Sequence, residues 1–297
     1  MSRLAAVLST TRPAFLILTP VCLLLGWSVV WAQNIEAPTY LFGLTLIGAM
    51  MAHIGVNTLN EYLDFDSGLD LNTNKTAFSG GSGALPNQPD LASVVLIISL
   101  ISLLITALIG LFFLWLYGWQ LLPIGVVGLL LVVAYTRWIN RSAWLCLLAP
   151  GLGFGVLMVS GAYFAVVGEF NVDLWLISLV PFFLVNNLLL LNQYPDIKPD
   201  KAAGRNHFPI AYGVSASNSV YLLFLLLTIL VIITGIVMDS LPVSSLLALL
   251  VMPLGFYALS GAIKFREAIG LHSNYLAANV AITLLLPTLL AVSIMIG

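Results

Sequence analysis

Long apolar runs separated by short polar or Pro/Gly-rich breaks make up most of this chain. A hydrocarbon core about 30 Å thick takes roughly 20 apolar residues for each helix that crosses it. Nine runs approach or exceed that length, and they lie at residues 13–32, 40–62, 92–116, 120–136, 143–167, 173–194, 217–238, 242–263 and 274–296. The pattern predicts an all-α polytopic membrane protein, a bundle of nine transmembrane helices that forms one domain over residues 1–297.

The composition argues against an ordinary soluble domain. Of the 297 residues 61% are hydrophobic and 7% are charged, and the mean hydropathy is +1.08; a soluble domain has about 25% charged residues. Cys22 and Cys146 fall in or near apolar spans, which favours packing roles over a disulfide framework or a metal site. The net charge of −2 says little about partners, so the placement of the charges has to be considered instead.

The basic residues fall on one side of the predicted bundle. With nine spans they occupy the N-terminal segment and alternate connections, whereas the opposite connections carry only acids. Under the positive-inside rule, the N-terminus and the basic connections are expected in the cytoplasm and the C-terminus outside. The basic set is Arg3, Arg12, Lys75, Arg137, Arg141, Lys198, Lys201, Arg205, Lys264 and Arg266, and the opposite acids are Glu36, Glu169, Asp173 and Asp239.

A first polar cluster lies where the second predicted helix ends, in the stretch NTLNEYLDFDSGLD. Four of its side chains follow the spacing i, i+3, i+4 and i+7, which places them on one helix face. They are Asn57, Asn60, Glu61 and Asp64, with His53 one turn earlier. Asp70 follows in a loop, and the glycines and proline of residues 79–86 argue against a regular helix there.

A second cluster follows the sixth predicted helix. Asn192, Asp196 and Asp200 would share one face of a continuous helix, although two prolines make that continuity doubtful. Lys201 and Arg205 come directly after them. Because the second and sixth helices run in the same direction, we expect the two clusters to converge on the cytoplasmic face.

Carboxylates gathered at a membrane boundary repel one another, by roughly 1 kcal/mol per pair at about 4 Å in water and about 4 kcal/mol at an effective dielectric constant of 20. A bound cation relieves this, and oxygen ligands favour a hard ion such as Mg²⁺, which is usually shared with substrate phosphates. Lys201 and Arg205 supply donors for phosphate oxygens. The clusters therefore predict a site for a metal-bound diphosphate with a hydrocarbon tail.

Three other interpretations of these residues compete with a diphosphate site. Any one of these acids alone is more often a solvated loop residue. A calcium-binding EF-hand loop starting at Asp64 fits poorly, because Leu69 stands where that loop needs glycine and Lys75 where it needs a bidentate acid. The SGGSG run at residues 79–83 could form an anion-binding nest, although a flexible loop is the more common outcome.

The segments NEYLDFDSGLD and DIKPDKAAGR resemble the two aspartate-rich motifs of the UbiA superfamily of intramembrane prenyltransferases, Asn-Asp-x-x-Asp-x-x-x-Asp and Asp-x-x-x-Asp. Asn60, Asp64, Asp196 and Asp200 match motif positions directly, and Glu61 replaces an aspartate while keeping its charge. The resemblance extends to helix number and motif placement over nearly the whole chain.

The end of the first motif is similar to the naphthoate-prenylating branch of the superfamily. The last aspartate of the general motif falls on Gly68, and the branch pattern Asn-Asp-Tyr-x-Asp-x-x-x-Gly-x-Asp makes Asp70 the corresponding acid. Tyr62 and the Gly-Gly-Ser stretch that follows also fit this branch.

Other positions depart from the superfamily pattern. Tyr135 lacks the usual basic residue four positions later, so Arg137 or Arg141 would have to substitute. The motif Asn-x-x-Arg-Asp reads Asn-Gln-Tyr-Pro-Asp from Asn192, which removes one expected arginine. His207 stands near a threonine or lysine of the pattern, where a lone histidine is more often a surface residue than a catalyst.

The resemblance implies a nine-helix bundle around a lipid-open central cavity, with Mg²⁺ and an isoprenyl diphosphate bound by the aspartates on the cytoplasmic side. It implies catalytic roles for Asp64, Asp196 and Arg205, metal ligation by Asn60, Glu61, Asp64, Asp70, Asp196 and Asp200, and substrate binding by Asn57, Asn60, Tyr135, Arg137, Arg141, Asn192, Lys201 and Arg205. Mg²⁺ and the basic residues would stabilise the departing diphosphate, which leaves an allylic carbocation that an electron-rich ring attacks.

The expected protein is thus a Mg²⁺-dependent enzyme of a prokaryotic cytoplasmic membrane that prenylates an aromatic acceptor. The favoured acceptor is 1,4-dihydroxy-2-naphthoate, which leads to menaquinone or phylloquinone, and 4-hydroxybenzoate or a porphyrin derivative is the alternative. Its partners would be the two small-molecule substrates and the lipid bilayer, without nucleic acid. A cation-coupled transporter is the competing class, and it would place its charges near the bilayer midplane on broken helices.

Overall fold

The computed structural model describes residues 2–71, 73, 75–76 and 78–297. Over these residues the chain is helical without β-strands, and eight helices are long and apolar enough to cross a membrane, with a shorter ninth at Trp119–Tyr135. The predicted all-α polytopic fold is confirmed. The helices are α1 (Arg3–Thr10), α2 (Pro13–Leu16), α3 (Leu18–Ala32), α4 (Thr39–Asp66), α5 (Ala84–Asn87), α6 (Ala92–Tyr117), α7 (Leu122–Tyr135), α8 (Ala143–Gly151), α9 (Met158–Val167), α10 (Val172–Asn192), α11 (Ile197–Ala202), α12 (Phe208–Val237), α13 (Met252–Phe265) and α14 (Ser273–Ile296).

Two helix starts differ from the sequence prediction. Helix α12 begins at Phe208 instead of residue 217, because Pro209 in its first turn suits a helix start and the chain continues through a kink at Gly213, where φ is +81°. The first apolar run is preceded by α1, and Arg12 between α1 and α2 adopts a left-handed φ of +53°. This bend turns the Arg12 side chain back towards α4.

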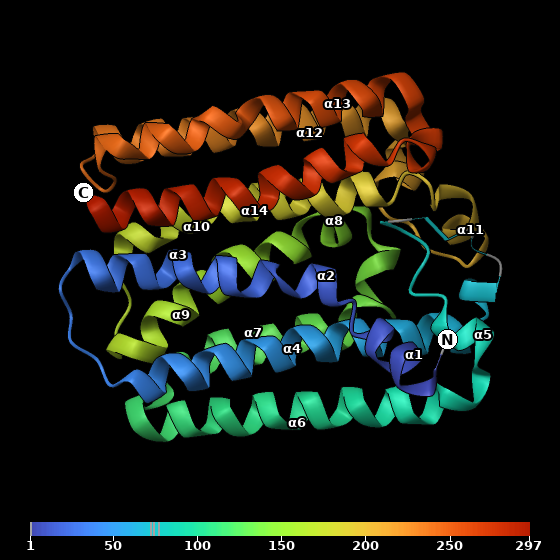
Figure 1. The fold of residues 1–297 in the computed structure, drawn as a ribbon, viewed down its shortest axis with the longest axis horizontal. Coiled ribbons are helices and arrows are strands. Elements are labelled where there is room, and N and C mark those ends of the chain that lie inside the picture. Colours follow the sequence, from blue (N-terminus) through green and yellow to red (C-terminus); the bar gives the residue numbers. More distant parts are fainter. Residues whose placement is uncertain (1, 72, 74, 77) are drawn as a thin grey trace.

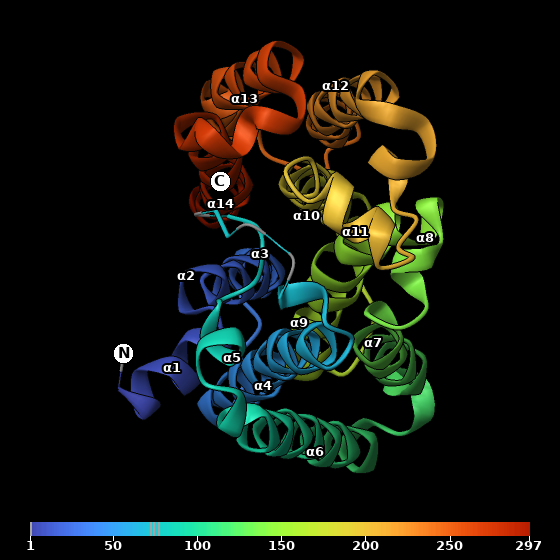
Figure 2. The ribbon, with the colours of Figure 1, turned by 90° about the vertical axis from the view of Figure 1, so that its right-hand side faces the viewer.

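The bundle presents apolar residues outwards as well as inwards. Helix α6 exposes Leu100, Leu104, Leu108 and Leu111, which recur at the spacing of one helix face and therefore form a surface suited to lipid. Helix α10 is largely buried and packs against α8, α12 and α14. In the end-on view α6 lies at the outside of the bundle and α10 among its neighbours (Figure 2).

A π-helical turn at Leu152–Leu157 joins α8 to α9. Pro150 lies inside α8, where its missing backbone N–H interrupts regular helix hydrogen bonding. The turn approaches α10 so closely that a Cβ on Gly155 would lie 2.5 Å from the backbone nitrogen of Phe182. The opposite side of the turn, with Phe154, faces the interior of the bundle.

The two ends of the bundle differ. The N-terminus, α5 and α11 gather at one end, and the C-terminus lies at the other (Figure 1). The end that holds α5 and α11 also holds the two acidic clusters, because α4 and α10 both finish there. The side of the membrane that this end faces stays a prediction from the basic residues.

Candidate functional site

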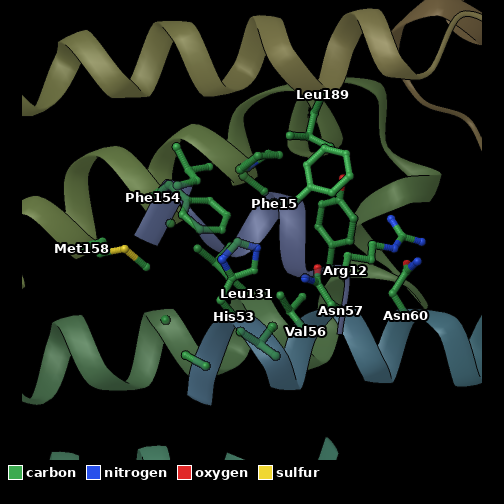
Figure 3. A pocket seen from close by; sticks show the side chains of 18 of the residues that line it. Arg12, Phe15, His53, Val56, Asn57, Asn60, Leu131, Phe154, Met158 and Leu189 are labelled. Carbon is green, nitrogen blue, oxygen red and sulfur yellow. The ribbon is translucent and has the colours of Figure 1, made fainter. Parts of the chain in front are cut away.

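One cavity of about 450 Å³ runs from the acidic clusters into the apolar interior. Side chains of α4, α6, α7, the α8–α9 segment and α10 line it. Its polar end includes Arg12, Asn57 and Asn60, and its inner part includes Phe154 and Met158 (Figure 3). A single space thus offers charged groups at one end and hydrocarbon contacts at the other.

The first cluster is held in place by hydrogen bonds that tie α4 to its neighbours. Asn60 donates from Nδ2 to Asp64 Oδ2 at 3.0 Å and accepts at Oδ1 from the Thr136 hydroxyl at 3.0 Å, which joins α4 to the end of α7. Asn57 donates from Nδ2 to the Thr11 carbonyl oxygen at 2.9 Å, before α2. Asn57, Asn60 and Asp64 all line the cavity.

Arg205 joins the two clusters. One guanidinium nitrogen is ion-paired with Asp64 and the other donates to Asp200 Oδ1 at 2.9 Å. Burial alone would lower the pKa of Arg205, but the charges of Asp64 and Asp200 outweigh it and hold the pKa above its ordinary value. The structure therefore brings the second and sixth spans together at their ends, as the sequence predicted.

Glu61 has a different environment from its neighbours, because it does not line the cavity. It is fully buried, and Oε1 accepts hydrogen bonds from Arg12 Nε at 3.0 Å, Arg12 Nη2 at 2.7 Å and the Ser82 backbone N–H at 2.7 Å. Oε2 accepts from the Ser82 hydroxyl at 2.6 Å. Both carboxylate oxygens are engaged by protein donors, so this geometry favours an anchoring role for the residue expected among the metal ligands.

The glycine-rich segment at residues 79–83, which we call the clasp loop, contacts both clusters. The Gly80 backbone N–H donates to Asp196 Oδ2 at 3.2 Å, and Ser82 binds Glu61. Gly81 has φ of +69°, and a Cβ there would lie 3.2 Å from Asp70 Oδ1, so both backbone conformation and space require glycine. The amides of Gly80 and Ser82 thus donate to protein carboxylates in this structure.

Two buried carboxylate oxygens, Asp70 Oδ2 and Asp196 Oδ1, have no hydrogen-bond partner among the residues that the structure describes. Burial raises the pKa of Asp70 to about 7, helped by the charges of Asp64 and Glu61, and burial with the Asp200 charge raises the pKa of Asp196 to about 7. Both residues line the cavity. Buried oxygens without donors are suited to a cation.

Mg²⁺ fits this donor set as a metal shared with a substrate. Over the described residues, no group of three or more His, Cys, Asp or Glu side chains is arranged to hold a metal ion by itself. Mg²⁺ usually takes one or two carboxylates and completes its shell with water and phosphate oxygens. Asp70 and Asp196 supply the free carboxylate oxygens, while Arg205 occupies part of Asp64 and Asp200.

The remaining sequence-predicted residues divide into two groups. Tyr135 and Asn192 line the cavity, and the buried Asn192 side-chain oxygen has no partner in the described part of the chain. Arg137, Arg141 and Lys201 are exposed and lie outside the cavity lining. The cations that the structure brings to the cavity are Arg12 and Arg205 instead.

Sequence reasoning missed Arg12 and misjudged His207. In the sequence, Arg12 counts only as one of the basic residues that predict the topology. Its partner Glu61 lies 49 positions away, so no local pattern connects the two residues. His207 is not a surface residue; its side chain is 1% exposed, and Nε2 is 3.1 Å from Asp200 Oδ2. Its position two residues before Pro209, at the N-cap of α12 and seven residues after Asp200, was the available signal.

Residues 18–280 match the model of the UbiA prenyltransferase family. The 1,4-dihydroxy-2-naphthoate octaprenyltransferase of Bacillus subtilis (strain 168) is 31% identical over 206 residues, which cover 68% of this chain and 64% of that protein. The aligned region thus spans somewhat less than two thirds of that relative.

Two solved structures share the fold. A UbiA homologue from Archaeoglobus fulgidus bound to DMAPP and Mg²⁺ is 13% identical, with a TM-score of 0.61 over 97% of this chain and 98% of that one. An apo UbiA homologue from Aeropyrum pernix K1 is 15% identical, with a TM-score of 0.65 over 92% and 97% of the two chains. The family match over most of the chain, joined to the convergence of its two aspartate-rich segments, shows that this chain belongs to the UbiA prenyltransferase family.

Proposed function

We propose that this protein is an intramembrane aromatic prenyltransferase that transfers a polyprenyl chain from its diphosphate to 1,4-dihydroxy-2-naphthoate. The observation that carries the proposal is the cavity, because it joins buried carboxylates and two arginines to an apolar interior in one space. A substrate with an anionic head and a hydrocarbon tail matches that division. The naphthoate acceptor is suggested by the Bacillus subtilis relative and by the pattern that ends at Asp70.

In this proposal the acidic end of the cavity binds the diphosphate. Arg205 and Arg12 line it and carry the positive charge and planar donors that suit phosphate oxygens. Asp70 and Asp196 would hold Mg²⁺, which when bound neutralises charge on the phosphate oxygens. Arg205 opposes the negative charge that grows on the leaving diphosphate as the bond to the prenyl carbon breaks.

The inner part of the cavity would exclude water from the reacting carbon. Its lining includes Leu131, Phe154 and Leu189, whose hydrocarbon side chains carry no oxygen or nitrogen that could trap an allylic cation. The electron-rich ring of the acceptor is then the group that takes the prenyl chain. An apolar, water-poor environment also strengthens the electrostatic contacts at the diphosphate end.

The transporter interpretation receives less support from the geometry. A cation-coupled transporter is expected to hold its charges at the bilayer midplane on interrupted helices. Here Asp64 lies in the last turn of α4, and Asp196 lies beyond the end of α10. Both acidic clusters therefore lie at one end of the bundle (Figure 1).

Activity of the purified protein tests the proposal. In lipid nanodiscs with Mg²⁺, a polyprenyl diphosphate and 1,4-dihydroxy-2-naphthoate, we expect a prenylated naphthalene product by mass spectrometry. Asp64→Asn and Asp196→Asn should each lower turnover about 100-fold or more, the scale of losing one charge-stabilising group in an active site. Asp90→Asn is the matched control, since Asp90 is an exposed acid paired with Arg3 at 2.7 Å.

Two results would count against this assignment. Prenylation of 4-hydroxybenzoate in preference to the naphthoate would keep the activity and change the acceptor. Wild-type turnover in both Asp64→Asn and Asp196→Asn would remove the acidic clusters from the reaction.

A further inference from the structure

His53 places a polar ring in the apolar part of the cavity. It lies on α4 seven residues before Asn60, which at 1.5 Å per residue is about 10 Å further into the bundle. The side chain lines the cavity and is 5% exposed. Figure 3 shows it on the side of Asn57 away from Arg12 and Asn60.

The orientation of the ring is fixed by two neighbours. Nδ1 lies 2.8 Å from the Thr19 hydroxyl oxygen on α3, and the ring meets Phe154 edge to face at 4.7 Å between centroids. Within the described part of the chain, the Thr19 hydroxyl has no other hydrogen-bond partner. Donation from the hydroxyl to Nδ1 satisfies the hydroxyl proton, whereas donation from Nδ1–H would leave that proton without an acceptor. We therefore assign the ring proton of the neutral imidazole to Nε2.

The Nε2–H group has no partner among the described residues. Its surroundings in the cavity are apolar and include Val56, Leu131, Phe154 and Met158. An imidazole N–H that opens into an apolar cavity without a protein acceptor is placed to donate to a ligand oxygen there. An apolar side chain of similar size would fill this space without the cost of burying a polar group, so packing alone does not account for a histidine here.

The proposed function offers three chemical groups to this donor, and one of them fits. The prenyl tail is a hydrocarbon and carries no acceptor. The diphosphate belongs with Arg205 and the acidic clusters, about 10 Å nearer the end of the bundle. The aromatic acceptor carries oxygens on an otherwise apolar ring, and its ring must enter the same inner space to meet the prenyl carbon.

We propose that His53 binds the aromatic acceptor, donating a hydrogen bond from Nε2 to a ring hydroxyl oxygen, with Thr19 as the positioning residue that holds the imidazole in this tautomer. This assignment rests on the proposed aromatic prenyltransferase function. It gives the acceptor a subsite on α4 that is separate from the diphosphate-binding end, and it orients the ring against Phe154.

Two substitutions separate the nitrogens of the imidazole. A glutamine amide reaches the position of Nε2, whereas an asparagine amide reaches only that of Nδ1. We expect His53→Gln to keep a KM for the acceptor near the wild-type value. His53→Asn should raise that KM about 3- to 10-fold, the loss of one neutral hydrogen bond, and leave the KM for prenyl diphosphate unchanged. Thr19→Val should raise the acceptor KM by less.

The opposite pattern overturns the proposal. If His53→Asn behaves as wild type and His53→Gln does not, the bond to Thr19 is the purpose of His53 and its role is structural. A change confined to the KM for prenyl diphosphate would assign His53 to the other substrate. Failure of the wild-type protein to prenylate any aromatic compound would instead reject the proposed function.

A ligand-based measurement covers the case in which the variants fail to fold. In the wild-type protein, 1-hydroxy-2-naphthoate should inhibit prenyl transfer about 3- to 10-fold more tightly than 2-naphthoate, which lacks the hydroxyl group. In His53→Leu, if it folds, the two compounds should inhibit equally. Equal inhibition constants in the wild-type protein would exclude a hydrogen bond from His53 to the ring hydroxyl.

Discussion

Arg205 connects the two acidic clusters through one ion pair with each of them. Its guanidinium group contacts Asp64 on α4 and Asp200 on α11, and its side chain is 18% exposed. A lysine keeps the charge, but a single ammonium group lacks the rigid geometry with which a guanidinium spans two oxygen acceptors. The identity of this side chain therefore matters as much as its charge.

Replacement of Arg205 should lower catalytic efficiency with respect to prenyl diphosphate. One lost charge-assisted hydrogen bond is worth about 1.5–3 kcal/mol, so Arg205→Ala should lose roughly 10- to 150-fold in kcat/KM, with Arg205→Lys between it and the wild type. Steady-state kinetics with each substrate varied in turn measures this. Lys198→Ala is the control, because Lys198 is exposed and nearby.

A rise in KM for the aromatic acceptor alone, with the diphosphate parameters unchanged, would contradict this role. It would place Arg205 in the acceptor subsite, and the division of the cavity into a charged end and an acceptor end would have to be redrawn.

At the scale of elements, the clasp loop connects segments that are distant in sequence. Its three successive residues Gly80, Gly81 and Ser82 meet Asp196, Asp70 and Glu61 in turn. Lys75 also donates to the Ser82 carbonyl oxygen. The loop therefore helps to set the distance between the acids of the two clusters.

Gly81→Ala should weaken Mg²⁺-dependent activity more than it weakens the fold. A left-handed backbone costs an alanine about 1–2 kcal/mol, and the new methyl group would press on the Asp70 carboxylate. Gly68→Ala is a matched control, since its φ is +76° and a Cβ there meets nothing within 4 Å. Thermal unfolding should shift similarly in both variants, while the Mg²⁺ concentration for half-maximal turnover rises only in Gly81→Ala. An equal Mg²⁺ requirement in the two variants would remove the clasp loop from metal binding.

Prediction from sequence succeeded where the signal was local. The apolar runs predicted the membrane spans, because a helix needs about 20 apolar residues to cross the hydrocarbon core. The helical spacing of Asn57, Asn60 and Asp64 predicted that these residues share one face. The anchoring of Glu61 by Arg12 and Ser82, the burial of His207 and the orientation of His53 were not predictable. Each depends on contacts between residues that no local sequence pattern connects.

At the scale of the whole molecule, the bundle has one end that holds the two acidic clusters and an opposite end that holds the C-terminus (Figure 1). The basic residues predict that the first of these ends faces the cytoplasm. Single cysteines at Ala202, which is exposed on α11, and at Gly297 test this in a protein without Cys22 and Cys146. We expect an impermeant thiol reagent to label Gly297→Cys from outside intact cells and Ala202→Cys only after lysis.

Labelling of both positions from outside would mean that the two ends of the bundle are not on opposite sides of the membrane. Labelling of Ala202→Cys alone from outside would invert the orientation and place the diphosphate site away from the cytoplasm.

The ion pair between Asp64 and Arg205 also bears on how the protein is made. The two residues are 141 positions apart, and at about 5–20 residues per second the ribosome needs roughly 7–28 s to pass from one to the other. During that interval α4 enters the membrane with an acid whose buried counter-charge has not yet been synthesised. The nascent chain must therefore leave Asp64 in contact with water or lipid headgroups until the sixth span arrives, so the pairing of the two acidic clusters becomes one of the later events in biogenesis.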